Sequence, residues 1–249
     1  MAAAEALYHI APRSDDVVAA LISAMRDTSG EVQDAVVVAL STVGTRAIPG
    51  LIEALNDDHV SVRLIALAVL AERTGDASST TRAIGRALSD SSDEVRIAAA
   101  HTLQRIGPAA RDAEPQLLEA ARNAAVQVRD AALRALVANG AGPERLRPVL
   151  EAALRDSAAA LRTTAVSLAV EAGMTAEKAF PAILPLTADS SSIVRQAAFR
   201  ALETLLGAPT VGLQVRRVLE RAATHPDSVV RRIVHRALSP TARATTNHE

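Results

Sequence analysis

The sequence predicts an all-α fold, an α-solenoid of about seven two-helix repeats. One motif recurs along the whole chain. It consists of an acidic or polar turn, an apolar residue followed by Arg, and then Ala and Leu at helical spacing. The Arg slot, filled by Gln in its first copy, recurs at steps of 30, 33, 33, 33, 33 and 36 residues: Gln33, Arg63, Arg96, Arg129, Arg162, Arg195 and Arg231. A fixed period of roughly 20 to 50 residues is typical of solenoids, in which each repeat covers the apolar face of its neighbour.

The motif itself predicts the second helix of each repeat, called helix B below. In the copy at residues 92–107, Ser92 is expected to cap the helix, and two acidic residues follow where the helix dipole is positive. Apolar residues then recur at steps of four, four and three along one face: Val95, Ala99, Leu103 and Ile106. A glycine suited to a left-handed cap ends this helix and its equivalents: Gly44, Gly75, Gly107, Gly140, Gly173 and Gly207.

A short loop and the first helix of the next repeat, helix A, follow each glycine. Four of these helices are expected to carry proline in the first turn, where its missing N–H has no helical partner: Pro49, Pro115, Pro148 and Pro181. Because an isolated helix of ~12 residues is marginal in water, stacking must bury the apolar stripes. Alanines at the helix B contact positions should let neighbouring helices approach closely: Ala66, Ala99, Ala132, Ala165 and Ala198.

The composition fits thin aliphatic layers better than one globular core. The 249 residues include two Phe, one Tyr and no Trp, whereas a compact domain of this length normally fills its core with aromatic side chains. The absence of cysteine excludes disulfides and thiolate chemistry. The longest unbroken apolar run, residues 64–71, has eight residues, against ~20 for a membrane span. No basic leader precedes an apolar stretch, so we expect a cytoplasmic protein that does not bind a membrane.

The motif resembles HEAT repeats, in particular the short variety found in bacterial bilin-lyase-type repeat proteins, over residues 15–239. The resemblance implies a right-handed solenoid. We expect residues 1–240 to form one repeat array, in which residues 1–11 align with the end of a helix B and act as a partial N-terminal capping repeat. Residues 241–249 are expected to form a polar, disordered tail.

In that family an Asp in the turn and an Arg six residues later form a polar ladder between successive repeats. The resemblance assigns this role to Asp57 with Arg63, Asp90 with Arg96, Asp156 with Arg162, Asp189 with Arg195, and Arg129. Three copies depart from the pattern, because Gln33 replaces the Arg, and Asn123 and His225 replace the Asp. We expect weaker joints at these three places, with faster hydrogen exchange in their turns.

The sequence contains no motif for catalysis or metal binding. It lacks a Gly-rich phosphate loop, a Gly-x-Ser-x-Gly elbow and a His-Glu-x-x-His motif. The six histidines include no pair at i, i+4: His9, His59, His101, His225, His235 and His248. We therefore expect no enzyme activity, no cofactor and no metal.

The resemblance places helix B on the concave side of the solenoid. On a helical wheel, the residues one, five and eight positions past the Arg slot lie opposite the buried stripe. This row runs from apolar to basic along the chain, and the partner-binding residues expected on it are Leu64, Ile97, His101, Arg134, Arg200, Arg232 and Arg236. Leu64 and Ile97 are expected to form an exposed apolar contact patch.

These features favour a non-catalytic scaffold that holds another protein in its concave groove. Residues 1–125 carry 11 basic and 17 acidic side chains, and residues 126–249 carry 16 and 11. The basic second half suggests an alternative, nucleic-acid or polyanion binding, although the scarcity of stacking aromatics counts against it. A further alternative, an accessory subunit of a bilin-lyase-type enzyme, follows from the resemblance alone.

Overall fold

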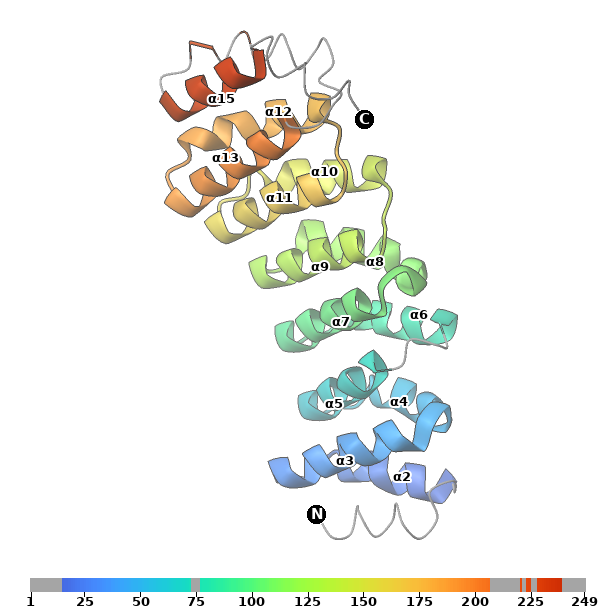
Figure 1. Cartoon of the computed structure of the whole chain (residues 1–249). Helices are drawn as coiled ribbons and strands as arrows, with labels where there is room; N and C mark the ends of the chain where they lie inside the picture. Colours follow the sequence, from blue (N-terminus) through green and yellow to red (C-terminus); the bar gives the residue numbers. More distant parts are fainter. Residues whose placement is uncertain (1–14, 73–76, 207–219, 221–222, 225–227, 239–249) are drawn as a thin grey trace. The chain divides into compact units, whose positions relative to one another are not determined.

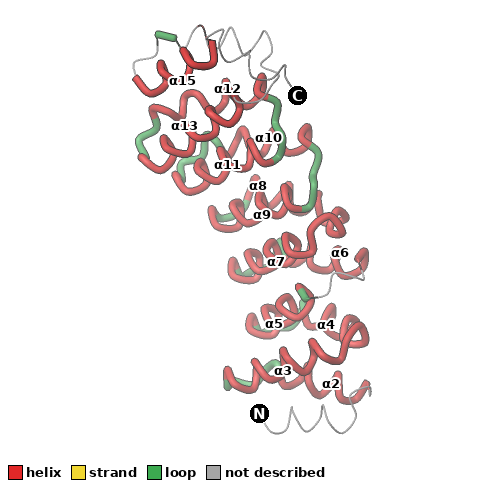
Figure 2. The backbone as a smooth tube through the Cα atoms, viewed as in Figure 1, coloured by secondary structure: helices red, strands yellow, loops and turns green. Residues whose placement is uncertain are grey.

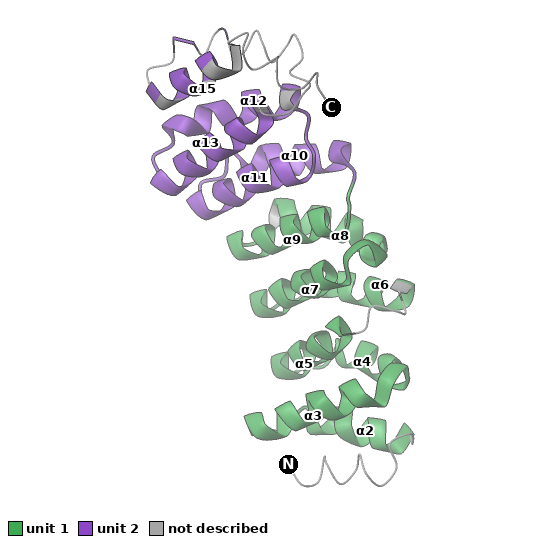
Figure 3. Cartoon of the chain, viewed as in Figure 1, with its two compact units in different colours: residues 1–141 green, residues 142–249 purple. Residues whose placement is uncertain are grey.

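The computed structural model describes residues 15–72, 77–206, 220, 223–224 and 228–238, which form helices and connecting turns without any strand (Figures 1 and 2). The all-α fold of two-helix repeats is thereby confirmed. The expected capping repeat at 1–11, the tail at 241–249 and two of the cap glycines, Gly75 and Gly207, lie outside the described residues. The chain divides into two compact units, residues 1–141 and 142–249 (Figure 3).

Helices A and B alternate along both units. In the N-terminal unit the hairpins are α2 (Asp15–Ala24) with α3 (Gly30–Val43), the 3-10 helix η1 (Gly44–Ala47) and α4 (Ile48–Ala54) with α5 (Val60–Ala71), α6 (Ala77–Ala87) with α7 (Asp93–Ile106), and η2 (Gly107–Ala113) and α8 (Glu114–Asn123) with α9 (Val126–Ala138). In the C-terminal unit they are α10 (Pro143–Ala153) with α11 (Ala159–Glu171), and α12 (Ala176–Ile183) and η3 (Leu184–Ala188) with α13 (Ser192–Leu206), followed by the helix B α15 (Ser228–Leu238).

Within each unit the B helices contact one another in one layer, and the A helices lie in a second layer (Figure 1). In the N-terminal unit α7 contacts α5 and α9 far more extensively than α6 contacts α8. The alanines expected at the B contacts are fully buried: Ala66, Ala99, Ala132, Ala165 and Ala198. Because a methyl group occupies so little space, these positions support the inference that alanine lets the B helices approach closely.

Glycines with positive φ end several B helices, although Gly44 and Gly107, with ψ of −154° and −142°, do not adopt the left-handed helical cap that the motif predicts. Gly44, Gly107, Gly140 and Gly173 have φ of 87°, 69°, 70° and 67°. After Gly140 the N–H of Ala141 donates to the carbonyl of Leu136 at 3.0 Å, the long bond of a Schellman motif. A side chain at such a φ is strained, so these turns depend on glycine.

The prediction for two of the four prolines was wrong. Pro49 and Pro115 do lie at the start of α4 and α8. Pro148 and Pro181 instead lie inside α10 and α12, because those helices begin earlier, at Pro143 and Ala176. Both internal prolines are exposed, so water can hydrate the carbonyl that the missing N–H leaves without a helical donor.

The cap expected from Ser92 is supplied by Asp90. Ser92 holds the N-cap position of α7 but makes no side-chain capping bond. Its own N–H donates instead to Oδ1 of Asp90 at 2.8 Å, and the same i to i+2 bond recurs at Asp27, Asp57, Asp156 and Asp189. The turn Asp therefore shapes the entry into helix B through an Asx turn.

The Arg of the motif joins two successive repeats rather than pairing with the carboxylate of its own turn. Nη1 of Arg63 donates to the backbone carbonyls of Asp57 and Asp58, at 2.7 and 3.2 Å. Its Nη2 donates to Oδ1 of Asp90, 27 residues further on, at 2.8 Å. Nε lies 2.8 Å from Oδ2 of Asp90 without donating a hydrogen bond to it, so that contact is electrostatic.

The C-terminal unit repeats this joint with better geometry. Arg162 donates from Nε and Nη2 to the two carboxylate oxygens of Asp189, at 2.8 and 2.7 Å, and from Nη1 to the carbonyl of Asp156. This bidentate bond holds the pKa of Asp189 below its usual value and raises the pKa of Arg162. Arg195 likewise donates to the carbonyl of Asp189 at 2.7 Å.

Two departures from the motif have different structural outcomes. Gln33 donates to the carbonyl of Asp27 at 2.8 Å, and the cation that it lacks is replaced by Arg26, whose Nη2 lies 2.5 Å from Oδ2 of Asp57. This joint, expected to be weak, therefore retains an ion pair. Where Asn123 replaces Asp, the guanidinium of Arg96 donates to Asp93 in its own helix instead of to a carboxylate of the next repeat.

Acid should weaken the joint at Asp57. The N–H of His59 and the guanidinium of Arg26 lower the pKa of Asp57 from 3.8 to about 2. A depressed pKa in the folded state gives stability that is present above about pH 4 and lost as the pH falls through about 2. We expect Asp57→Asn, which keeps an acceptor for the N–H of His59, to cost between about 1 and 2 kcal/mol at neutral pH.

Urea unfolding of both proteins at several pH values measures this difference. The wild-type and Asp57→Asn curves of free energy against pH should converge as the solution is acidified towards pH ~2. Asp58→Asn, at the exposed neighbouring position, should follow the wild type throughout. A constant gap between wild type and Asp57→Asn at every pH would contradict the assignment of this charge.

A buried amide adds a contact that the repeat pattern did not predict. Asn139 at the end of α9 is 2% exposed. In the amide orientation that suits its neighbours, Nδ2 donates to the carbonyls of Leu103, Gly107 and Ala135, at 2.9, 3.0 and 3.1 Å. It thus ties the C-terminal ends of α7 and α9 together by satisfying carbonyls that helix ends leave open.

Among the described residues, one segment, Gly30–Ala54, is long and apolar enough by composition alone to cross a membrane. Counting only unbroken apolar runs in the sequence did not single it out. Gly44 divides it into α3 and a second helical stretch that starts with η1. Val36, Leu40 and Leu51 within it are fully buried against neighbouring helices, so its hydropathy is explained by the repeat core.

Candidate partner-binding surface

The helix B surface is the outward face of α3, α5, α7 and α9 in the N-terminal unit and of α11, α13 and α15 in the C-terminal unit. Leu64 and Ile97, which the sequence predicts to form an exposed apolar patch on this surface, are both only partly exposed. Each lies one position past the Arg slot, on B helices that contact each other.

The polar candidates in the N-terminal unit are exposed but already have neighbours. Nδ1 of His101 lies 3.4 Å from Oε1 of Gln104 on α7. Nε of Arg134 donates to Oδ2 of Asp130 at 2.8 Å, one turn earlier on α9. This i, i+4 ion pair partly neutralises the cation that the sequence suggested for anion binding.

In the C-terminal unit, Arg200 on α13 and Arg232 on α15 are exposed. The structure describes the backbone of Arg236 on α15 but not its side chain. Within the described part of the chain, the guanidinium of Arg200 makes no ion pair or hydrogen bond, unlike those of Arg63, Arg134 and Arg162. Arg200 is therefore available to a ligand, and the same holds for Arg232, whereas Arg134 is paired.

Two large hydrophobic side chains in the described residues are strongly exposed, and both lie on B helices. Val38 on α3 is 66% exposed and Ile193 on α13 is 65% exposed. Val38 belongs to the row read from the sequence, whereas Ile193, two positions before the Arg slot, does not. A comparison of that position across repeats could have found it, because five of the other six copies hold polar or small residues and only the last holds an apolar one: Glu31, Ser61, Glu94, Gln127, Ala160 and Val229.

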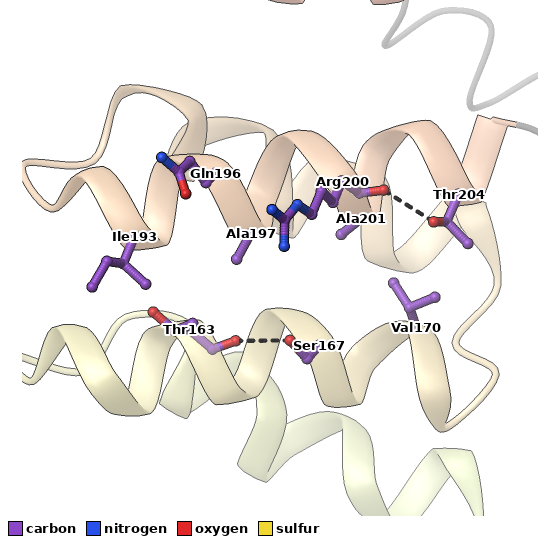
Figure 4. A pocket seen from close by; sticks show the side chains of 9 residues that line it. All are labelled: Thr163, Ser167, Val170, Ile193, Gln196, Ala197, Arg200, Ala201 and Thr204. Atoms are coloured by element: carbon purple, nitrogen blue, oxygen red, sulfur yellow. Dashed lines mark hydrogen bonds between the residues drawn. The ribbon is translucent and has the colours of Figure 1, made fainter.

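Ile193 and Arg200 border one shallow groove between α11 and α13 (Figure 4). The groove has a volume of about 340 Å³ and is lined by Thr163, Ser167 and Val170 from α11 and by Ile193, Gln196, Ala197, Arg200, Ala201 and Thr204 from α13. Its base between the polar side chains is formed by small residues, half-buried Ala197 and buried Ala201. The arginine side chain runs back along α13 towards Ala197, so its charge lies over the groove (Figure 4).

A larger hollow, of about 670 Å³, lies between α2 and α4 on the helix A layer of the N-terminal unit. Four of its five charged groups are paired with each other, Arg26 with Asp57 at 2.5 Å and Arg46 with Asp15 at 3.8 Å, and the fifth is Glu53. No cluster of three or more His, Asp or Glu side chains suited to a metal ion occurs in the described segments. The groove between α11 and α13 therefore has the clearer ligand-binding chemistry.

Comparison with known proteins places the repeat architecture in a family. HEAT repeats match residues 1–71, 48–137 and 81–171, which together span more than half of the chain. The chain belongs to the HEAT-repeat family. No curated protein matches it.

Three solved structures share the fold. YibA of Escherichia coli is 17% identical with a TM-score of 0.60, and the alignment covers 97% of both chains. An engineered protein is 22% identical with a TM-score of 0.54, covering 95% of this chain and 73% of that one. An archaeal HEAT-like repeats protein from Thermococcus onnurineus is 17% identical with a TM-score of 0.53, covering 88% and 95%. At these identities the likeness establishes the fold, and function must be argued from this chain's own surface.

Proposed function

We propose that this HEAT-repeat chain is a non-catalytic scaffold that binds a protein partner on its helix B surface. The observation that carries the proposal is the location of Val38 and Ile193, the strongly exposed large hydrophobic side chains of the described residues, on B helices. The repeats bury their aliphatic side chains by stacking, so an apolar side chain left bare on the B layer is available to a second protein.

The electrostatics support a non-catalytic role. A perturbed pKa marks a candidate catalytic group only when structural ion pairs do not explain it. The lowered pKa values of Asp57 and Asp189 arise from bonds to backbone N–H groups and to Arg26 and Arg162 in the joints between repeats. These carboxylates are therefore engaged in holding repeats together.

The alternative of polyanion binding is less well supported by the side-chain contacts. Arg134 is paired with Asp130, and the chain has only two Phe and one Tyr as aromatic side chains on which bases could stack. Nucleic-acid affinity grows with the number of phosphates neutralised, which requires a series of free cations. A protein partner needs only a local match of apolar and polar groups.

Site-specific photo-crosslinking in lysate of the source cell tests the proposal. A photoreactive amino acid is placed on the helix B surface at Val38, His101 or Ser167, and on exposed helix A positions at Glu53, Glu119 or Ala152. We expect one recurrent protein adduct from the B positions and none from the A positions. Equal labelling from both layers, or no protein adduct from any B position, would refute a partner on the helix B surface.

A further inference from the structure

From the groove between α11 and α13 we infer that the partner presents an acidic peptide segment with an aliphatic side chain close to an Asp or Glu. This inference rests on the proposed scaffold function and names the chemistry of its partner at one place. The carboxylate binds Arg200 and Gln196, and the aliphatic side chain packs against Ile193.

The hydrogen-bond donors of the groove are concentrated on α13. The hydroxyls of Thr163, Ser167 and Thr204 already donate to backbone carbonyls one turn earlier, at 2.8, 3.3 and 3.0 Å. Figure 4 shows the bonds made by Ser167 and Thr204. Their protons are therefore committed, and their oxygens face the groove only as acceptors. The guanidinium of Arg200 and the amide of Gln196 supply the remaining N–H donors.

This distribution selects an anionic group. An arginine presents five N–H donors in a planar fork that matches a carboxylate. No acidic side chain lines the groove, and in the described residues the guanidinium of Arg200 has no carboxylate partner. A ligand carboxylate would gain a charge-assisted hydrogen bond that the protein itself does not supply.

The apolar end of the groove determines which kind of side chain the partner carries close to its carboxylate. Ile193 precedes Arg200 by seven residues on α13, which is ~10 Å along a helix. The arginine side chain is directed back towards Ala197 (Figure 4). The distance from its guanidinium to Ile193 is therefore shorter than the distance between the backbones of the two residues. An extended peptide advances ~3.3 Å per residue, so an aliphatic side chain two or three residues from the Asp or Glu reaches Ile193.

A protein segment fits this groove better than a nucleic-acid backbone does. The lining contains one cation, Arg200, and no aromatic ring. A phosphate chain would find a single contact there, and its bases would find no stacking partner. The small residues Ala197 and Ala201 instead leave room for a peptide backbone to approach α13.

Selection of peptides from a randomised eight-residue display library on the full-length chain tests the inference. We expect the wild type to enrich peptides with Asp or Glu two or three residues from Leu, Ile or Val. Arg200→Glu should abolish this enrichment and weaken the best selected peptide by about tenfold, because the substitution replaces an attraction with a repulsion. Ile193→Ser should weaken it less and relax the aliphatic preference.

The matched control is Arg155→Glu, which makes the same charge change at an exposed position of the same unit, outside the groove. It should bind the selected peptide as the wild type does. No acidic enrichment, or enrichment that survives Arg200→Glu, would overturn the assignment to this groove. A different result would assign the groove to polyanions. The library would then show no peptide enrichment, while a single-stranded oligonucleotide would bind in a salt-sensitive way and lose its binding in Arg200→Glu.

The outcome is separable from that of the scaffold proposal. If crosslinks from Val38 or His101 capture a partner while the library shows no dependence on Arg200, the helix B surface binds a protein elsewhere and the groove inference fails alone. If neither position nor Ser167 captures a protein, the scaffold proposal fails first.

Discussion

Replacing Arg63 by methionine should lower the free energy of unfolding by about 3 kcal/mol. The side chains of Arg63 and Asp90 are 8% and 11% exposed, so the substitution leaves a carboxylate in a mostly dry joint without its cation. It also removes donors from the carbonyls of Asp57 and Asp58. Urea unfolding followed by far-UV circular dichroism measures the loss, with hydrogen exchange of α5 and α7 amides locating it.

Arg96→Met is a matched control for this substitution, because Arg96 fills the same slot one repeat later. Its guanidinium donates to the carbonyl of Asp90 and to Asp93, whose side chain is 52% exposed. We expect a loss of only about 1 kcal/mol, since a pair within one helix surface is worth little. Equal losses for the two variants would show that the ion pair to the next repeat adds nothing to the joint.

Replacing Phe180 by alanine should cost between about 3 and 5 kcal/mol. Phe180 on α12 is fully buried and is the largest of the fully buried side chains in the described residues. The layers around it consist of aliphatic and alanine side chains, which are too short to refill the cavity. The C-terminal unit should therefore unfold at a lower urea concentration, with slower recovery of amide protection in α12 and α13.

The other phenylalanine, Phe199 on α13, provides the control. It is half-exposed, so Phe199→Ala should cost roughly 1 kcal/mol by loss of apolar contact without a closed cavity. Phe180→Leu should fall between the two, because it keeps most of the buried volume. A Phe180→Ala variant as stable as Phe199→Ala would mean that the layer repacks around the gap.

The repeat architecture was predictable because it is written in short-range patterns. The apolar steps around Val95 and Leu103 define a helix face, and the cap at Gly107 follows from the backbone freedom of that residue alone. Neither inference needs knowledge of a neighbour. Helix starts were less predictable: Pro148 and Pro181 lie inside helices, since an exposed proline is tolerated there once the flanking apolar residues are buried.

The candidate site was predictable only in part. The helical wheel correctly placed Arg200 at an exposed position of α13, but it did not indicate that Arg134 is paired with Asp130. It missed Ile193, which is 65% exposed although it lies outside the row read from the sequence.

The sequence by itself determined the two-helix repeat, the glycines at the ends of the B helices and the family, because periodicity and backbone preferences act over a few residues. Only the tertiary structure decided which groups meet across repeats. Arg63 reaches Asp90 rather than the carboxylate of its own turn, and Arg26 replaces the cation that Gln33 lacks. The physical reason is that charge pairing and exposure depend on the separation of stacked helices, which a linear pattern does not contain.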